Sequence, residues 1–188
     1  MKTVFLVVGR TASGKDSIVK KVAKDLDLQI LKSYATRPIR VDDPKDVDAH
    51  TYIKPEQVEQ YRQRMIAYTK IGEYEYFATI DQLKTVDFYI IDPQGIEFMR
   101  QYSLDDVKLC VVYIYVPDEI RSMRALKVRG DGRDIFEKRN QKEMEQFNRF
   151  EQNKNWDYMI TNLNFDDSVN ILKDIIKRER SDLNEGTN

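Results

Sequence analysis

The sequence predicts an α/β fold in which a parallel central sheet lies between layers of helices. Short apolar runs typical of buried parallel strands occur at residues 3–8, 88–92 and 109–116, and a shorter run follows at 158–161. Amphipathic patterns predict helices over residues 16–26, 94–102, 118–129, 135–150 and 167–180, with Asp118 as the N-cap of the third helix. Because strands and helices alternate along the chain, a doubly wound sheet is favoured.

Composition limits the class of protein. The chain has 188 residues, enough for one domain with a sizeable core, and its 31 basic and 32 acidic side chains leave a formal net charge of −1. This balance gives no general reason to expect a nucleic acid or an anionic membrane as partner. No apolar run approaches the roughly 20 residues that span a bilayer, and the N-terminus does not resemble a secretion signal. We therefore expect a cytoplasmic protein with no membrane and no nucleic-acid partner.

The rarest residue types exclude several kinds of site. Cys110 is the single cysteine, so no intrachain disulfide can form, and its apolar surroundings in the sequence predict a buried thiol. His50 is the single histidine, which excludes most histidine metal sites and Ser-His triads. A lone histidine is most often a packing or surface residue, so a binding role for His50 needs a second argument.

The most specific motif directly follows the first apolar run. Residues 9–16 read G-R-T-A-S-G-K-D, which departs from the phosphate-loop pattern G-x-x-x-x-G-K-(S/T) in its last letter. The two glycines let backbone N–H groups point at phosphate oxygens, and the following helix presents its positive end to the anion. A chance glycine turn before a helix is the alternative. The motif predicts a nucleotide-phosphate site at Gly9, Arg10, Thr11, Ala12, Ser13, Gly14, Lys15, Asp16 and Ser17.

The unusual last letter of the motif concerns the metal ion. A Ser or Thr hydroxyl normally binds Mg²⁺ at that position, and Asp16 stands there instead. A carboxylate is also a hard oxygen ligand and can bind the ion directly or through water, while Ser17 is next in line to replace it.

Residues 33–81 interrupt the alternation of strands and helices. Alternating patterns at 50–53, 65–71 and 74–78 predict strands, a short helix is expected over 55–64, and residues 40–46 read as an exposed loop. We interpret residues 33–81 as a small antiparallel lobe that binds the acceptor, inserted into a core formed by 1–32 and 82–180. The polar tail at 181–188 is expected to be frayed.

Arginines gather in two stretches. Arg37 and Arg40 offer two planar forks three residues apart, beside Ser33, and suit a dianionic monophosphate. The second stretch, residues 124–139, reads as a mobile lid in which Gly130 and Gly132 supply hinge freedom. Its arginines are Arg124, Arg129, Arg133 and Arg139, whereas solvated helix faces are expected for Arg121 and Arg180.

Taken in order, these motifs resemble the guanylate kinase family of nucleoside monophosphate kinases. Residues 33–40, S-Y-A-T-R-P-I-R, are similar to the family's S-x-T-T-R-x-x-R, and residues 74–79 lie where the family has a Tyr-Gly-Thr/Ser element. Residues 92–95, D-P-Q-G, correspond to a D-x-Q-G element. The lid follows, with Arg124, Arg129-Gly130 and Lys138-Arg139, and residues 156–162 resemble the terminal strand whose Asn borders the donor adenine.

The resemblance implies a P-loop NTPase three-layer fold with an Arg-rich lid, using ATP and Mg²⁺ to phosphorylate a nucleoside monophosphate. It assigns catalysis to Lys15, Arg129 and Arg139, and further donor contacts to Arg124 and Asn162. For Mg²⁺ our own hypothesis is that Asp16 and Asp92 supply the carboxylates near the ion. His50 aligns roughly with a family tyrosine that touches the acceptor phosphate. The implied acceptor site comprises Ser33, Arg37, Arg40, His50, Tyr68, Tyr76, Thr79 and Asp92.

Three positions depart from the family pattern. Ala67 stands where a family glutamate reads the guanine edge, Ala78 where a hydroxyl is expected, and Ile90 where a second acidic residue precedes the D-x-Q-G aspartate. Tyr68, Thr69, Glu73 and Glu75 lie nearby and are candidates to read another base, or guanine from a different direction. Strand alternation places the two glutamates opposite Tyr74 and Tyr76, so they are solvent residues if the tyrosines face the nucleotide. The base and sugar of the acceptor therefore stay open, as does the oligomeric state.

Two other functions fit parts of the pattern. One is a guanylate-kinase-like interaction module that binds acidic or phosphorylated partners, with which Ala67 and Ala78 are compatible. The other is a phosphate-loop kinase acting on a nucleic-acid end or another small phosphate ester. The complete Gly9–Lys15 signature and the lid arginines favour the nucleotide kinase, because a binding module has no need of a donor site.

Overall fold

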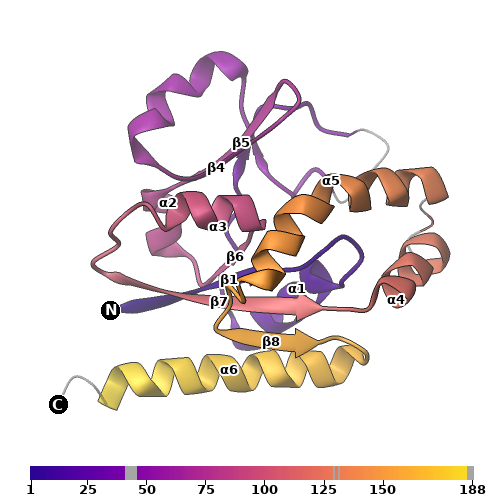
Figure 1. Ribbon diagram of the computed structural model, residues 1–188. Coiled ribbons are helices and arrows are strands. Elements are labelled where there is room, and N and C mark those ends of the chain that lie inside the picture. Colours follow the sequence, from indigo (N-terminus) through magenta and orange to yellow (C-terminus); the bar gives the residue numbers. More distant parts are fainter. Residues whose placement is uncertain (41–45, 129, 131, 186–188) are drawn as a thin grey trace.

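The computed structural model describes residues 1–40, 46–128, 130 and 132–185 of the chain. Over these residues, the central sheet consists of parallel strands in the order β6-β1-β7-β8 (Figure 1). Val7 of β1 lies opposite Ile90 of β6 and Val112 of β7. The predicted α/β fold with a parallel sheet is confirmed. The strands are β1 (Lys2–Val8), β6 (Phe88–Ile90), β7 (Val107–Tyr115) and β8 (Tyr158–Thr161).

Successive residues of β1 pack against opposite layers of helices. Phe5 and Val7 share a core with α1 (Lys15–Leu26) and α6 (Phe165–Glu185). Val4 and Leu6 face the other way and share a core with α3 (Pro93–Met99) and α5 (Arg133–Gln152). Burial on both faces explains why this strand reads as an unbroken apolar run rather than an alternating one. Figure 1 shows α6 on one side of the sheet, with α3 and α5 on the other.

A second sheet forms the upper part of the molecule in Figure 1. Its strand order is β3-β2-β5-β4, with β4 antiparallel to β5 and β2 parallel to β3. The parallel pair was not expected from the sequence. Its strands are β2 (Tyr34–Ala35), β3 (Thr51–Tyr52), β4 (Met65–Ile71) and β5 (Tyr74–Thr79), and 3₁₀ helices at Pro55–Gln57 and Glu59–Arg64 replace the predicted single helix. The short helix α2 (Ile80–Thr85) follows and was missed.

Two helical predictions differ from the structure. The helix expected over 118–129 is α4 (Asp118–Met123) followed by a π-helical turn at Arg124–Val128, and its N-cap is Pro117 rather than Asp118. Proline fits this position because it has no N–H of its own, and a residue before the first turn has no intrahelical acceptor to donate to. Helix α6 continues to Glu185, so part of the expected frayed tail is helical. The first helix-breaking residue after the predicted end is Gly186, which explains the extension.

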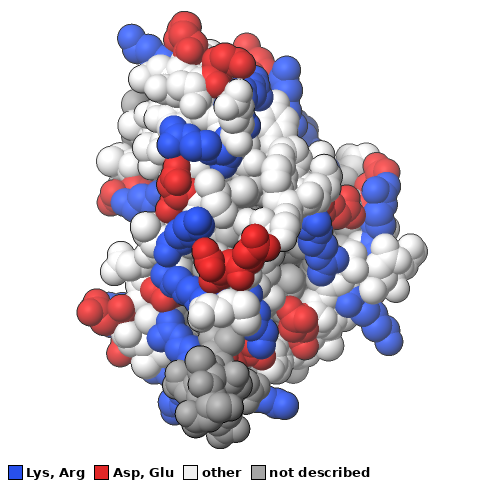
Figure 2. Space-filling view, turned by 90° about the vertical axis from the view of Figure 1, so that its left-hand side faces the viewer, with Lys and Arg blue, Asp and Glu red and all other residues white. Residues whose placement is uncertain are grey.

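Charged side chains are mixed on the face shown in Figure 2, where lysines and arginines lie interspersed with aspartates and glutamates. Such a mixed face provides no broad field of one sign to attract a polyanion. None of the helices described here combines the length and the apolar character needed to cross a bilayer.

Candidate functional site

The predicted phosphate loop connects β1 to α1 and requires both of its glycines. Gly14 has φ +84°, and a Cβ there would lie 2.8 Å from Asn162 Nδ2. At Gly9 a Cβ would lie 2.9 Å from the carbonyl oxygen of Ile114. Gly14 is also the N-cap of α1 and supplies no side-chain cap, so the first N–H groups of this helix are available to an anion.

Lys15 and Asp16 open helix α1. Lys15 Nζ lies 3.4 Å from Asp16 Oδ2, and the Asp16 side chain is 64% exposed. The Lys15 charge lowers the pKa of Asp16, which therefore stays ionised near neutral pH. An ionised and accessible carboxylate in this turn offers oxygen ligands to a cation beside bound phosphates.

Asp92 joins the two sheets beside the loop. It follows β6, where Ile91 N donates to the carbonyl oxygen of Val7, so Asp92 and the loop lie at the same sheet edge. Its Oδ1 accepts from Gly95 N at 2.7 Å, which caps α3, and its Oδ2 accepts from Thr69 Oγ1 at 3.3 Å. Burial raises the pKa of Asp92. Over the described residues no three histidine, cysteine or acidic side chains gather as a metal cluster.

A cavity of about 140 Å³ opens between the two sheets. It gathers five of the residues predicted to bind the acceptor. Ser33 Oγ lies 2.9 Å from His50 Nδ1, and the His50 ring packs edge-on against Tyr76. Burial, helped by the nearby Arg37 charge, lowers the pKa of His50, which is therefore neutral near pH 7. The residues that line the cavity include Ser33, His50, Ala67, Tyr68, Thr69, Tyr76, Tyr89 and Asp92.

Thr79 does not line this cavity. Its hydroxyl caps α2 by accepting from Gln82 N, and Gln82 Oε1 accepts in return from Thr79 N at 3.1 Å. The sequence carried the signal for this, since T-x-x-Q before a helix is a capping box. Neighbouring Ala78 is fully buried, and its partner across the sheet is Ala67.

Arg37 is buried in an ion pair instead of presenting an open fork. Its Nη1 and Nη2 donate to the two carboxylate oxygens of Asp46, each at 2.6 Å. The predicted exposed loop at 40–46 is wrong at its end, because Asp46 is 3% exposed and also accepts from Arg40 N. The Arg40 side chain is exposed.

Arg124 and Asn162 reach the loop from the other side. Arg124 Nη2 donates to the Asn162 carbonyl oxygen at 2.9 Å, and Asn162 Nδ2 donates to the Ser13 carbonyl oxygen at 2.8 Å. The Asn162 side chain is buried and thus fixes the shape of the loop. Arg139 lies exposed on α5, and Arg129 falls outside the described residues.

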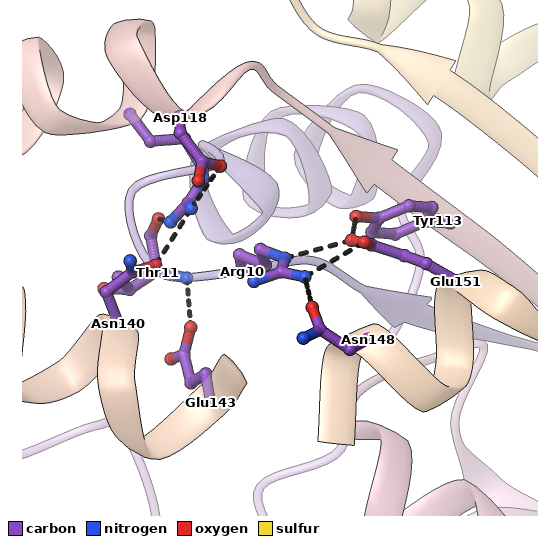
Figure 3. Close-up of polar contacts among 9 residues, drawn as sticks. Arg10, Thr11, Tyr113, Asp118, Asn140, Glu143, Asn148 and Glu151 are labelled. Atoms are coloured by element: carbon purple, nitrogen blue, oxygen red, sulfur yellow. Dashed lines mark hydrogen bonds and ion pairs between the residues drawn. The ribbon is translucent and has the colours of Figure 1, made fainter. Parts of the chain in front are cut away.

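Three charged residues make contacts that the sequence did not indicate, and Figure 3 shows those of Arg10. Arg121 was expected on a solvated face but is fully buried, and it donates to the Thr11 carbonyl oxygen at 3.1 Å. Its spacing of four from the buried Ala125 places both on one helix face, a signal the charge obscured. Arg10 donates through Nε and Nη2 to Glu151. Glu75, expected in solvent, pairs with Arg62 at 2.8 Å.

Comparison with known proteins gives a consistent result. The family model described as "Guanylate kinase" matches residues 1–179. A guanylate kinase from Psychrobacter arcticus is 27% identical and covers 96% of this chain and 88% of its own length. One from Salmonella typhimurium is 26% identical, over 95% of this chain and 88% of its own. The solved guanylate kinase from Anaplasma phagocytophilum superposes with a TM-score of 0.61 at 13% identity, covering 95% of this chain and 86% of its own, which shows a shared fold.

Proposed function

The chain belongs to the guanylate kinase family, since that family's model matches residues 1–179, and we propose that it is an ATP-dependent nucleoside monophosphate kinase. The observation that carries the proposal is the meeting of two features at one edge of the central sheet. The phosphate loop leaves β1 there, and the cavity lined by Asp92 adjoins β6, the neighbouring parallel strand.

The donor side rests on the loop and its surroundings. Backbone N–H groups at the start of α1 and the Lys15 ammonium would hold the phosphates of ATP. Arg124 and Asn162, already bonded to one another beside the loop, would border the rest of the donor. In this role the lid arginines Arg129 and Arg139 would neutralise the charge that develops during transfer.

The acceptor side rests on the cavity. Ser33, His50 and Tyr76 would bind the monophosphate, with Arg40 reaching it from the exposed side. Tyr68 would contact the base. An acceptor phosphate oxygen is already anionic and needs no dedicated general base, so the work of the protein is positioning.

Buried Arg37 would contribute mainly charge and rigidity to this side of the site. The oxygen ligands available here suit Mg²⁺. Asp16 presents an exposed ionised carboxylate next to Lys15, and Asp92 lies at the end of the adjoining strand. When bound, the ion would screen the phosphate charges. We further propose that the protein is cytoplasmic and acts on small molecules. The binding-module alternative is not favoured, because it leaves the glycines and Lys15 of the loop without a function.

Turnover with a panel of acceptors tests the proposal. ADP and the diphosphate product are measured with GMP, AMP, CMP, UMP and their deoxy forms, using ATP and Mg²⁺. We expect activity with at least one acceptor, and a loss of at least 100-fold in Lys15→Met. Lys20→Met changes an exposed lysine of the same helix and serves as the matched control.

Two results would count against the proposal or its details. Absence of turnover with every acceptor, together with binding of a phosphopeptide, would support the interaction module instead. A strong preference for GMP would show that guanine is read without a carboxylate at Ala67, which leaves Asp92 as the acidic side chain lining the cavity.

A further inference from the structure

Arg121 contacts both the phosphate loop and residues that flank the predicted lid segment, residues 124–139. Figure 3 shows its partners Thr11, Asp118 and Asn140 close together. This segment begins three residues after Arg121 and ends directly before Asn140. Arg121 Nη2 donates to Asn140 Oδ1 at 2.9 Å and to Asp118 Oδ1 at 2.7 Å. The residues that flank the segment are therefore joined to one another by one guanidinium.

The same guanidinium also binds the loop. Arg121 Nη1 donates to the Thr11 carbonyl oxygen at 3.1 Å, across 110 positions of sequence. Its side chain is 1% exposed and stacks over Phe136 of α5, with 5.9 Å between the guanidinium carbon and the ring centre. Burying a charge of this kind costs desolvation free energy. The folded protein gains little stability from it compared with an apolar side chain of similar size. Its presence here calls for an explanation other than stability.

Helix α5 holds the loop at further points. Thr11 N donates to Glu143 Oε2 at 2.7 Å, so both the N–H and the carbonyl oxygen of Thr11 are held by side chains. Arg10 donates to Glu151 and to Asn148, and it lies over the Phe147 ring. Positions 140, 143, 147 and 151 recur every three or four residues and so share one face of α5. From Asn140 onward, side-chain hydrogen bonds therefore connect α5 to Arg10 and Thr11 of the loop.

We propose that Arg121 is a positioning residue that clasps both ends of the lid segment to the phosphate loop. Arg124 lies one turn after Arg121, and Arg139 directly precedes Asn140. The clasp therefore fixes the backbone positions from which both arginine side chains extend toward the ATP phosphates. Misplacement of such groups by about 1 Å can cost on the order of 100-fold in rate. The inference rests on the proposed kinase function for its catalytic consequence but not for the clasp itself.

The first test uses variants that break the clasp without removing the fold. Arg121→Met keeps the buried volume and removes the donors, and Asn140→Leu removes the link between the two ends of the segment alone. Asn140→Asp keeps an oxygen acceptor for the guanidinium at this position and is the conservative rescue. Arg180→Met is the matched control, because Arg180 makes a surface ion pair with Asp87 far from this joint.

We expect Arg121→Met and Asn140→Leu to lower kcat at least 10-fold and to change the KM of the acceptor less than twofold. Both should also release more ADP than diphosphate product, because a loose lid admits water to the donor. Asn140→Asp and Arg180→Met should behave like the parent. Parental kcat and coupling in both clasp variants would overturn the proposal, as would a loss of activity matched by a loss of folded protein in both.

Hydrogen exchange gives a readout that does not depend on turnover. In the parent without nucleotide, backbone amides of residues 9–16 and 132–140 should exchange at least 10-fold more slowly than in Asn140→Leu. Equal exchange would refute the clasp whatever the activity. Slower exchange in a parent that phosphorylates no acceptor would instead retain the clasp and refute the proposed kinase function.

Discussion

Arg37 and Asp46 form a bidentate ion pair, in which the two side chains are 7% and 3% exposed. The Arg37 guanidinium lies over the Tyr52 ring, and the Tyr52 hydroxyl donates to the Asp46 carbonyl oxygen at 2.7 Å. The guanidinium holds the pKa of Asp46 well below its usual range, and the carboxylate raises the pKa of Arg37. Asp46 thus anchors an arginine whose sequence context suggested direct binding of a phosphate.

Removing Asp46 should leave a buried and unpaired charge. We expect Asp46→Ala to lower the free energy of unfolding by about 3–5 kcal/mol, as found when one partner of a buried pair is deleted. Urea denaturation monitored by fluorescence measures the change. Asp48→Ala is the control, because its ion pair with Lys32 lies on the surface and should be worth less than about 1 kcal/mol. A loss from Asp46→Ala no larger than that of the control would mean that Arg37 finds solvent or another partner.

His50 should make the protein less stable as the solution is acidified. Burial lowers its pKa in the folded state, so the unfolded chain, with a pKa of about 6.5, binds the proton more readily. The stability that neutral His50 contributes is present above that value and lost as the pH falls below it. His50→Gln should therefore show a flatter dependence of unfolding free energy on pH between about 7 and 5. Because the chain has 1 histidine, an unchanged dependence would contradict burial of a neutral ring.

The phosphate loop and the strands were predictable because their signals are local. Glycines that relieve close contacts, a lysine at a fixed offset and unbroken apolar runs can each be read within a few residues, as at Gly9, Gly14 and Lys15. The cavity was predicted in part, since Ser33, His50, Tyr68, Tyr76 and Asp92 do meet around it.

The buried charges were not predictable in the same way. Arg121 and Thr11 are 110 residues apart, and Arg10 and Glu151 are 141 apart, so no local pattern pairs them. A charged residue is predicted to be exposed to solvent unless its ion-pair partner is known. Here the partners are brought together only when α5 packs against the loop. Thr79 differs, because its capping signal was present within three residues but was outweighed by its place in the family motif.

Asp16 should set the magnesium requirement of the reaction. Its carboxylate is exposed and kept ionised by Lys15, and Ile90 supplies no acidic group at the neighbouring strand. We expect Asp16→Ala, which removes the carboxylate without supplying a hydroxyl, to raise the Mg²⁺ concentration for half-maximal rate by about 10-fold, which corresponds to about 1.4 kcal/mol. Titration of Mg²⁺ at fixed free ATP measures this. An unchanged requirement in Asp16→Ala, with a raised one in Ser17→Ala, would assign the ligand to Ser17 instead.

The folded protein should be more stable when the Asp92 carboxyl is protonated. Burial raises its pKa in the folded state above the unfolded value of about 3.9, so the native protein binds the proton more tightly. That contribution is fully present below the unfolded pKa and is lost as the pH rises through the folded pKa. An asparagine keeps the Oδ1 acceptor for Gly95 N, and its Nδ2 can donate to the Thr69 hydroxyl oxygen in place of the bond that the carboxylate accepts. It carries no charge and is a good N-cap.

Asp92→Asn should therefore unfold with a free energy equal to or above that of the parent at pH 7, and the difference should shrink towards pH 4. Acceptor turnover should nevertheless fall at least 10-fold in kcat/KM, because the carboxylate lines the acceptor cavity. Asp81→Asn is the control, since Asp81 lies exposed in the first turn of α2 and pairs with Arg64 on the surface. If Asp92→Asn instead lost stability equally at both pH values while keeping parental kcat/KM, Asp92 would be a helix cap and no part of the acceptor site.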